Sequence, residues 1–171
     1  MTVDPEALFL ANQRRLFSYF RRVVGQTDAA RDLTQDVFLR VTRTTVPDAG
    51  DTEVRAWLFR IARNLALDYS RKRIRQPEPA PLVEHGSRHP SQDVDFAVHE
   101  ALTALSDLDR DVFLMREVAG LGYDEIARAC GLTPDAVRSR IHRARLQLRA
   151  LLAAPIATRR TIPMRQSGRE T

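Results

Sequence analysis

The chain has 171 residues, which allows one ordinary domain or two small ones, because about 60 residues is near the lower limit for an independent core. Its formal net charge is +5, and 26 of its 27 basic residues are arginine. Its apolar runs are short and Met1 is followed by an acidic stretch, so we expect neither a transmembrane span nor a signal peptide. These features favour a cytoplasmic protein that does not insert directly into a membrane.

Three amphipathic helices are expected in the first part of the chain. The first runs from Pro5 to Val24 and ends at Gly25, the second covers residues 28–43, and the third covers residues 53–74. Apolar residues recur at helical spacing in all three, so each helix can bury one face against the others. The expected inward residues are Leu8, Phe9, Leu16, Phe17, Phe20, Leu33, Val37, Phe38, Val41, Trp57, Leu58, Ile61 and Leu65.

Residues 76–95 contain four prolines and no helical periodicity, and they predict a flexible linker. His85 and His89 lie four residues apart there, but neither a helix nor a cysteine supports a metal site. We therefore expect a domain over residues 1–75, a linker over 76–95, a second domain over 96–152 and a flexible basic tail over 153–171. We expect no metal ion or cofactor.

The second half predicts a helix-turn-helix. A helix near residues 95–105 precedes one capped by Ser106 with Asp109 three positions on, which ends by Gly120. A short helix over residues 123–130 is followed by Gly131, and Thr133 with Pro134 begins the next helix. The predicted fold is all-α, with two small helical domains joined by a flexible linker, and the C-terminal domain contains this motif.

Positive charge gathers in two separate segments. Residues 133–149 hold five arginines against Asp135, and residues 55–76 hold seven basic residues against Asp68. A solvated face would mix the signs more evenly, so two basic faces favour a polyanion that is contacted in two places. The single cysteine, Cys130, is expected to be a small buried hydrophobe rather than a redox sensor.

The last helix has the pattern of a DNA-recognition helix. Val137, Ile141, Ala144 and Leu148 fall on one side at spacings of four, three and four, which predicts a buried face. The alternative is a solvated helix in a bundle, but the preceding turn and the basic surface favour entry into a major groove. The residues expected to bind DNA are Arg138, Ser139, Arg140, His142 and Arg143.

The third helix carries aromatic rings among its cations. Trp57, Phe59 and Tyr69 are interleaved with arginines, and rings in such a setting suit unstacked bases better than a duplex. A single helix-turn-helix buries a modest area, so a second contact of this kind would raise the affinity for nucleic acid.

Three stretches together resemble the extracytoplasmic-function class of bacterial RNA polymerase sigma factors. They are "DLTQDVFLRV" (32–41), "RAWLFRIARNLALDYSRKR" (55–73) and "LGYDEIARACGLTPDAVRSRIHRAR" (121–145), and the resemblance covers residues 5 to about 152. The sequence departs from the family where Gly122 replaces a capping Ser and where Asp135 and Ala136 replace a Gly and Thr pair. The second departure removes one hydroxyl from the start of the recognition helix.

The resemblance implies a transcription initiation factor that directs core RNA polymerase to promoters. The first half would bind the polymerase and the minus-ten element, and the second half the minus-thirty-five element. It also implies an anti-sigma partner, and a loop at residues 45–53 that holds a flipped base. The residues implied are Asp32, Gln35 and Asp36 for core polymerase, and Arg60, Arg63, Asn64, Asp68, Arg71 and Lys72 for the minus-ten strand.

The sequence shows no constellation typical of catalysis. The four histidines are scattered, there is no glycine-rich phosphate loop, and the acids of "DLTQD" fit a binding surface better than a general acid and base. We therefore do not expect an enzyme. The alternative from another class is a one-component transcription regulator that binds duplex DNA as a dimer.

Overall fold

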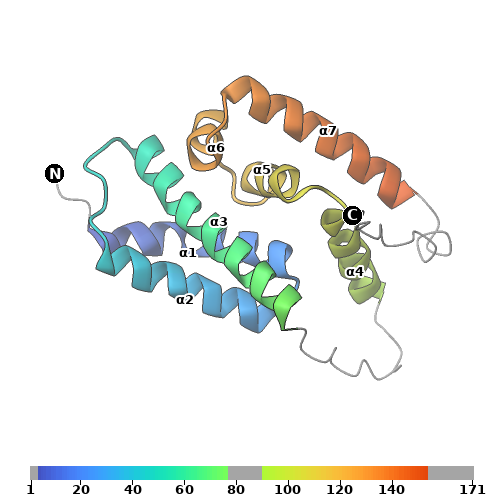
Figure 1. The fold of residues 1–171 in the computed structure, drawn as a ribbon, viewed down its shortest axis with the longest axis horizontal. Helices are drawn as coiled ribbons and strands as arrows, with labels where there is room; N and C mark the ends of the chain where they lie inside the picture. The colour runs from blue at the N-terminus through green and yellow to red at the C-terminus, as the bar shows by residue number, and fades with distance from the viewer. Residues whose placement is uncertain (1–3, 77–89, 154–171) are drawn as a thin grey trace, which may run out of the picture.

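The computed structural model describes residues 4–76 and 90–153, which form seven α-helices and no strand (Figure 1). The prediction of an all-α fold in two helical halves is confirmed. The predicted linker lies mostly outside the described residues, together with His85 and His89, and so does the predicted tail beyond Ala153.

The N-terminal half is built from α1 (Pro5–Val24), α2 (Thr27–Arg43) and α3 (Asp51–Arg75), whose bounds agree with the predicted helices within two residues. The three helices pack against one another around aromatic side chains. The rings of Phe9 and Phe38 join α1 to α2 with centroids 4.9 Å apart. Tyr19 and Phe59 join α1 to α3 in an edge-to-face contact at 6.0 Å, a geometry that aromatic rings favour.

The ends of α1 follow from its sequence. Asp4 precedes the helix and its carboxylate accepts the backbone N–H of Glu6 at 3.1 Å, which satisfies one of the unpaired donors at the helix start. Pro5 fits the first turn because its fixed φ is already helical. At the other end Gly25 adopts a φ of 75°, in the left-handed region where glycine is favoured, and its N–H donates to the Arg21 carbonyl.

The C-terminal half contains α4 (Pro90–Thr103), α5 (Asp107–Glu117), α6 (Tyr123–Cys130) and α7 (Pro134–Ala153). The sequence predicted that the first of these helices begins near residue 95, and this start was wrong. Pro90 was assigned to the proline-rich linker, but proline is well suited to the first position of a helix, and α4 begins there.

The caps predicted for this half are present. Ser106 Oγ accepts the backbone N–H of Asp109 at 3.2 Å, and Thr133 Oγ1 accepts that of Ala136 at the same distance. At Gly122 the cap works in one direction only, because the Gly122 N–H donates to the Glu125 carboxylate at 2.7 Å. Gly131, at φ 67°, makes the turn between α6 and α7.

The two halves share one hydrophobic core. The buried apolar side chains form a continuous cluster with members in both halves, and α3 packs on α6 while α1 packs on α4 and α5 (Figure 1). The sequence predicted two helical units but gave no sign of how they meet. This contact decides which of the predicted functional residues are accessible.

Candidate nucleic-acid interface

The helix-turn-helix of α6 and α7 presents one side of α7 to solvent. The predicted inward residues Val137, Ile141, Ala144 and Leu148 are all buried. Of the residues predicted to bind DNA, Arg138, Ser139, His142 and Arg143 are exposed. The predicted buried face is confirmed, because burial follows the helical period, and four of the five residues predicted to bind DNA are exposed.

Arg140 differs from its exposed neighbours. It is half-buried, and its Nη1 donates to Asp109 Oδ1 at 2.7 Å, which ties α7 to α5. Burial raises the pKa of the Asp109 carboxyl, but hydrogen bonds from Arg140 and Ser106 outweigh it and leave that pKa below its ordinary value. This bond fixes the position of α7 relative to α5.

Arg138 is held near the start of α7 by two weak contacts. Its guanidinium is 3.0 Å from Asp135 and lies 5.2 Å from the ring centroid of Tyr123. Both the arginine and its acid are largely exposed, so the ion pair contributes little to stability. The contact with the Tyr123 ring keeps the side chain near the N-terminal end of α7.

The third helix carries an exposed polar stripe. Arg60, Asn64, Asp68 and Arg71 recur at spacings of four, four and three, which places them on one face, and all four are exposed. Arg71 lies 3.7 Å from Asp68 within this stripe, and the exposed Lys72 adjoins it. The stripe forms one continuous exposed surface along α3.

The prediction for the aromatic residues of α3 was partly wrong. Phe59 is fully buried and packs on Tyr19, so it has no ring face to offer to a base. Phe59 follows the inward Leu58 and lies on the same buried side of α3, although Arg60 comes next in the sequence. Trp57 and Tyr69 are only partly buried and remain available for stacking.

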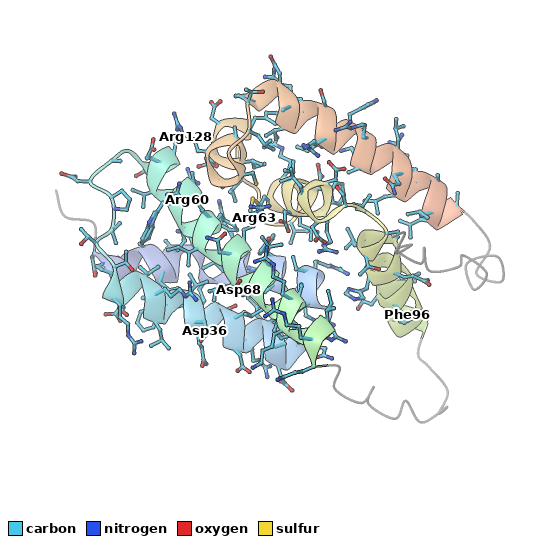
Figure 2. All side chains as sticks on the ribbon, in the orientation of Figure 1. Asp36, Arg60, Arg63, Asp68, Phe96 and Arg128 are labelled. Carbon is cyan, nitrogen blue, oxygen red and sulfur yellow. The ribbon has the colours of Figure 1, made fainter. Side chains whose placement is uncertain are left out.

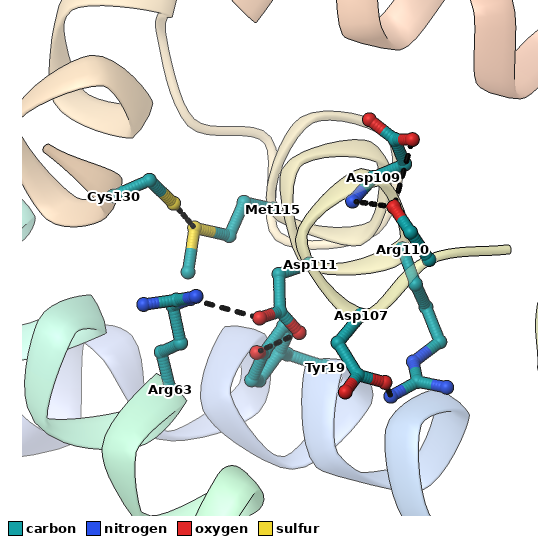
Figure 3. Close-up of polar contacts among 9 residues, drawn as sticks. Tyr19, Arg63, Asp107, Asp109, Arg110, Asp111, Met115 and Cys130 are labelled. Carbon is teal, nitrogen blue, oxygen red and sulfur yellow. Dashed lines mark hydrogen bonds and ion pairs between the residues drawn. The ribbon is translucent and has the colours of Figure 1, made fainter. Parts of the chain in front are cut away.

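Arg63 does not lie on this stripe. It points toward α5 and the C-terminal half, whereas Arg60 points away from it (Figure 2). The Arg63 Nε donates to Asp111 Oδ2 at 2.8 Å, and the Tyr19 hydroxyl donates to Oδ1 of the same carboxylate at 3.1 Å (Figure 3). The structure therefore separates Arg63 from the other residues predicted for the minus-ten strand.

The Asp111 carboxylate is almost completely buried, at 2% exposure. Burial raises its pKa above the ordinary value, although the Arg63 guanidinium acts in the opposite direction. Burial and the adjacent Asp111 hold the pKa of Tyr19 well above that of a free phenol. In this network the Arg63 guanidinium and the Tyr19 hydroxyl both donate hydrogen bonds to the buried carboxylate of Asp111.

Three further ion pairs join the halves at the surface of this contact. Arg55 lies 2.8 Å from Glu125, Arg128 lies 3.6 Å from Glu53, and Arg22 lies 3.2 Å from Asp95. These pairing residues and Asp111 were not predicted from the sequence. The sequence did indicate that Asp111 faces inward, because it lies at helical spacing from the apolar residues Leu108, Val112 and Met115.

The exposed side of α2 carries the residues predicted to face the polymerase. Asp32, Gln35 and Asp36 are all exposed, and Figure 2 shows Asp36 at the edge of the N-terminal half that lies away from α7. A hollow between α1 and α2 adjoins them. It is lined by Phe9, Gln13, Arg14, Phe17, Arg31, Thr34, Gln35 and Phe38.

Metal sites, membrane spans and reactive thiols are the other features that bear on function. Within residues 4–76 and 90–153, no group of three His, Cys, Asp or Glu side chains is placed to hold a metal ion. No helix in the same ranges has both the length and the apolar character that a membrane crossing requires. Cys130 is largely buried beside Met115, and burial raises the pKa of its thiol to about 11, so it is poorly reactive.

Known proteins share both halves of this arrangement. The family "Sigma-70 region 2" matches residues 8–76, and the family "Sigma-70, region 4" matches residues 95–148. The ECF RNA polymerase sigma factor EcfG of Rhodopseudomonas palustris is 32% identical over 133 residues, which cover 75% of this chain and 74% of that protein. The chain belongs to the ECF class of RNA polymerase sigma factors.

Other relatives of this sigma factor agree. The ECF sigma factor SigE of Mycolicibacterium smegmatis is 35% identical over 150 residues, which cover 81% of the chain but only 58% of SigE. Among solved structures, the sigma factor RpoE of Bartonella quintana, in complex with the anti-sigma factor NepR, superposes with a TM-score of 0.67 at 28% identity. That match covers 86% of this chain and 95% of RpoE.

CnrH, solved in complex with the cytosolic domain of CnrY, superposes with a TM-score of 0.65 at 27% identity, and the match covers 86% of each chain. The family matches divide this sigma factor between its two halves, with α1, α2 and α3 in region 2 and the helix-turn-helix in region 4. The resemblance seen in the sequence is confirmed. The alternative of a one-component dimeric regulator is not supported, because both matched regions are those of sigma factors.

Proposed function

We propose that this sigma factor binds core RNA polymerase and directs it to specific promoters, contacting the upstream element with α7 and assisting strand opening with α3. The observation that supports this proposal most strongly is that α3 and α7 each have an exposed basic face, and that each helix lies in a matched sigma-70 region. In this proposal residues 1–75 and the helices α4 to α7 are the two functional domains. The protein acts in the cytoplasm, needs no cofactor and catalyses no reaction itself.

The upstream element is bound by the exposed side of α7. Arg138 and Ser139 lie nearest the start of the helix and are assigned to base edges, where arginine can donate two hydrogen bonds to guanine. His142 and Arg143 lie further along the exposed side and are assigned to phosphate, which fixes the register of the protein on the duplex. Arg140 acts through its bond to Asp109.

The minus-ten strand is assigned to the stripe of Arg60, Asn64, Asp68, Arg71 and Lys72 on α3. A single strand needs cations along its backbone and flat side chains against its bases, and α3 supplies both, with Trp57 and Tyr69 as the rings. Asp68 orients Arg71 within this stripe. Arg63 bonds to Asp111 and lies outside this stripe.

The polymerase is assigned to the exposed face of α2. Asp32, Gln35 and Asp36 present two carboxylates and an amide, a composition suited to a basic partner surface rather than to DNA. An anti-sigma factor is the second protein partner. This assignment is supported by the structure of RpoE, which was solved with its anti-sigma factor NepR.

The test is transcription in vitro with core polymerase and a set of genomic promoter fragments. Transcripts that begin at defined promoters only when both core enzyme and the sigma factor are present are the expected result. Co-purification with core polymerase should accompany them. Duplex binding without any stimulation of polymerase across the fragments would contradict the proposal.

A further inference from the structure

We propose that Asp135 is a specificity-determining residue of the upstream contact, and that its carboxylate accepts a hydrogen bond from the amino group of a cytosine in the major groove. This inference rests on the proposed function, because it concerns the duplex that α7 contacts. It adds one base to the recognised sequence and names the group that selects it. Asp135 stands where the family pattern has glycine, so the contact is a feature of this chain.

Asp135 lies on the face of α7 that is assigned to DNA. It is the second residue of the helix, and Arg138, Ser139 and His142 follow it at spacings of three, four and seven, which places all four on one side. Its side chain is 90% exposed, and α7 runs along the outside of the C-terminal half (Figure 1). Residues at the start of a recognition helix are those that contact base edges.

A carboxylate in this place can recognise only a hydrogen-bond donor. Phosphate oxygens repel it, and so do the acceptor atoms that guanine and thymine present in the major groove. Adenine has an amino group there, but its N7 acceptor lies beside that group, whereas cytosine presents its amino group alone. The carboxylate of Asp135 therefore favours cytosine over the other three bases.

Arg138 reduces the cost of bringing this acid close to DNA. Its Nη1 donates to Asp135 Oδ1 at 3.0 Å, so the two side chains together present no net charge to the phosphates. A carboxylate has about four acceptor sites on its two oxygens, and this bond uses one of them. Asp135 can therefore hold Arg138 and accept from a base at the same time.

The pair is held in place by the first helix of the motif. The Arg138 guanidinium lies 5.2 Å from the centroid of the Tyr123 ring, and the Arg116 guanidinium lies 4.7 Å from the same centroid. Arg116 is itself fixed, because its Nη1 donates to the Leu121 carbonyl at 2.8 Å. Side chains that are ordered before binding lose less conformational entropy in the complex, and this order favours a base contact by the pair.

An acid in the first turn also stabilises a helix through the helix dipole, and this role requires a control. Asp124 is the matched residue, because it is the exposed second residue of α6 and does not lie on the recognition helix. The start of α7 is capped independently of Asp135, since Thr133 Oγ1 accepts the backbone N–H of Ala136. The helix should therefore persist in Asp135→Ala, and circular dichroism checks its helical content.

The experiment selects sequences from a pool of duplexes that is randomised over the length covered by one recognition helix. The full chain, Asp135→Ala and Asp124→Ala are compared. The full chain and Asp124→Ala should both enrich cytosine at one position, and Asp135→Ala should lose about tenfold of this preference. Selection of the same sequences by Asp135→Ala and the full chain would overturn the proposal.

Affinity for the unselected pool separates base reading from a structural role. Asp135→Ala removes an anion from the DNA face, so it should bind the random pool at least as tightly as the unaltered protein does, although it discriminates less. Damage to α7 would weaken binding to every sequence. Weaker binding of the random pool with unchanged base preference would overturn the proposal.

The contact itself is tested by removing the amino group from the DNA. A duplex in which 2-pyrimidinone replaces the selected cytosine should bind the unaltered protein about tenfold more weakly, and Asp135→Ala less than about twofold more weakly. Arg138→Ala keeps the carboxylate and should still lose about tenfold. Equal losses in the unaltered protein and in Asp135→Ala would overturn the proposal.

The complex with core polymerase completes the test. If the full chain alone selects no sequence, the selection is repeated with the complex, and the absence of a selected cytosine in both cases would overturn the proposal. Selection of cytosine by the full chain, together with failure of transcription with core polymerase, would instead overturn the proposed function and leave the assignment of Asp135 intact.

Discussion

The imidazole of His99 on α4 lies directly over Gly25, where α1 ends. A Cβ atom added at Gly25 would come within 2.6 Å of His99 Cε1, closer than real Cβ contacts allow. Glycine is therefore required at position 25 for two reasons: there is no space for a Cβ atom, and the backbone adopts a φ of 75°. The C-terminal end of α1 therefore packs closely against α4, the first helix of the C-terminal half.

Gly25→Ala should destabilise the protein more than Gly120→Ala. Both glycines have positive φ, so an alanine at either costs about 1–2 kcal/mol in backbone strain. Only Gly25 has a neighbour within 4 Å of the added Cβ, and this contact should cost about 1 kcal/mol more. Urea unfolding of the two variants measures the difference. Equal losses would show that α4 moves away from Gly25 without cost.

His99 should make stability depend on pH. Burial lowers its pKa below the ordinary 6.5, and nearby arginines lower it further, against a hydrogen bond with the backbone of Arg22. The charged groups around it are Arg21 and Arg22 of α1, Arg73 of α3, Asp95 of α4 and Arg110 of α5.

The sign follows from the unfolded chain, which binds a proton on His99 at a higher pH than the folded protein does. The free energy of unfolding should therefore fall as the pH drops below about 6.5, and it should continue to fall through the lower pKa of the folded state. Urea unfolding of the natural protein and of His99→Gln between pH 8 and pH 5 measures this effect. The variant should show a flatter profile; parallel profiles would exclude His99 as the cause.

The sequence predicted what depends on neighbours along the chain. Helix ends such as Gly25 and Ser106 carry their own capping chemistry, and the buried side of α7 repeats with the helical period, so these features follow from local patterns. The start of α4 could not be predicted from a local pattern, because proline is equally common in a linker and in the first turn of a helix.

The contact between the halves could not be predicted in the same way. Arg63 and Asp111 lie 48 positions apart, and Tyr19 and Asp111 lie 92 apart, so no local pattern links them. The inward position of Asp111 was visible as a charge at apolar spacing, but its partners were not. For the same reason no local pattern indicated that Arg63 is held by Asp111.

Asp36→Arg should weaken assembly with core polymerase. Asp36 is exposed on α2, and reversing its charge at a close interface should replace an attraction with a repulsion worth a few kcal/mol. A pull-down with core enzyme measures the loss. Glu100→Arg, an exposed acid on α4, is the control and should assemble normally. Normal assembly of Asp36→Arg would remove this face of α2 from the polymerase contact.

Arg143→Ala should change the salt dependence of duplex binding. If Arg143 contacts one phosphate, its removal should reduce the slope of log affinity against log salt by about 0.9 and weaken all sequences alike. Binding titrations at several salt concentrations measure the slope. A change confined to one base pair, at constant slope, would assign Arg143 to a base.

Arg138→Ala should behave in the opposite way. Arg138 lies near the start of α7, and we propose that it contacts a base edge, so the variant should lose about 1–3 kcal/mol of discrimination at one upstream base pair. Titrations with single-base variants of the upstream element measure this loss. An even loss of affinity over all sequences would reverse the assignments of the two arginines.

Asn64→Ala should impair strand opening while leaving the binding of polymerase and upstream duplex intact. Asn64 is exposed on the stripe of α3, one turn from Arg60 and one from Asp68, and its amide can both donate to and accept from a base edge. A base contacted in this way must first leave its stack, at a cost of a few kcal/mol that the protein must offset.

The loss should therefore be largest on promoters with the preferred minus-ten base. Permanganate footprinting on matched promoters measures opening, and Gln147→Ala, an exposed amide near the end of α7, serves as the control. Asn64→Ala should also lose part of its preference among minus-ten sequences, because the pairing edge of the base has lost its partner. Normal opening with unaltered base preference would mean that Asn64 contributes to the structure of α3 and does not contact the strand.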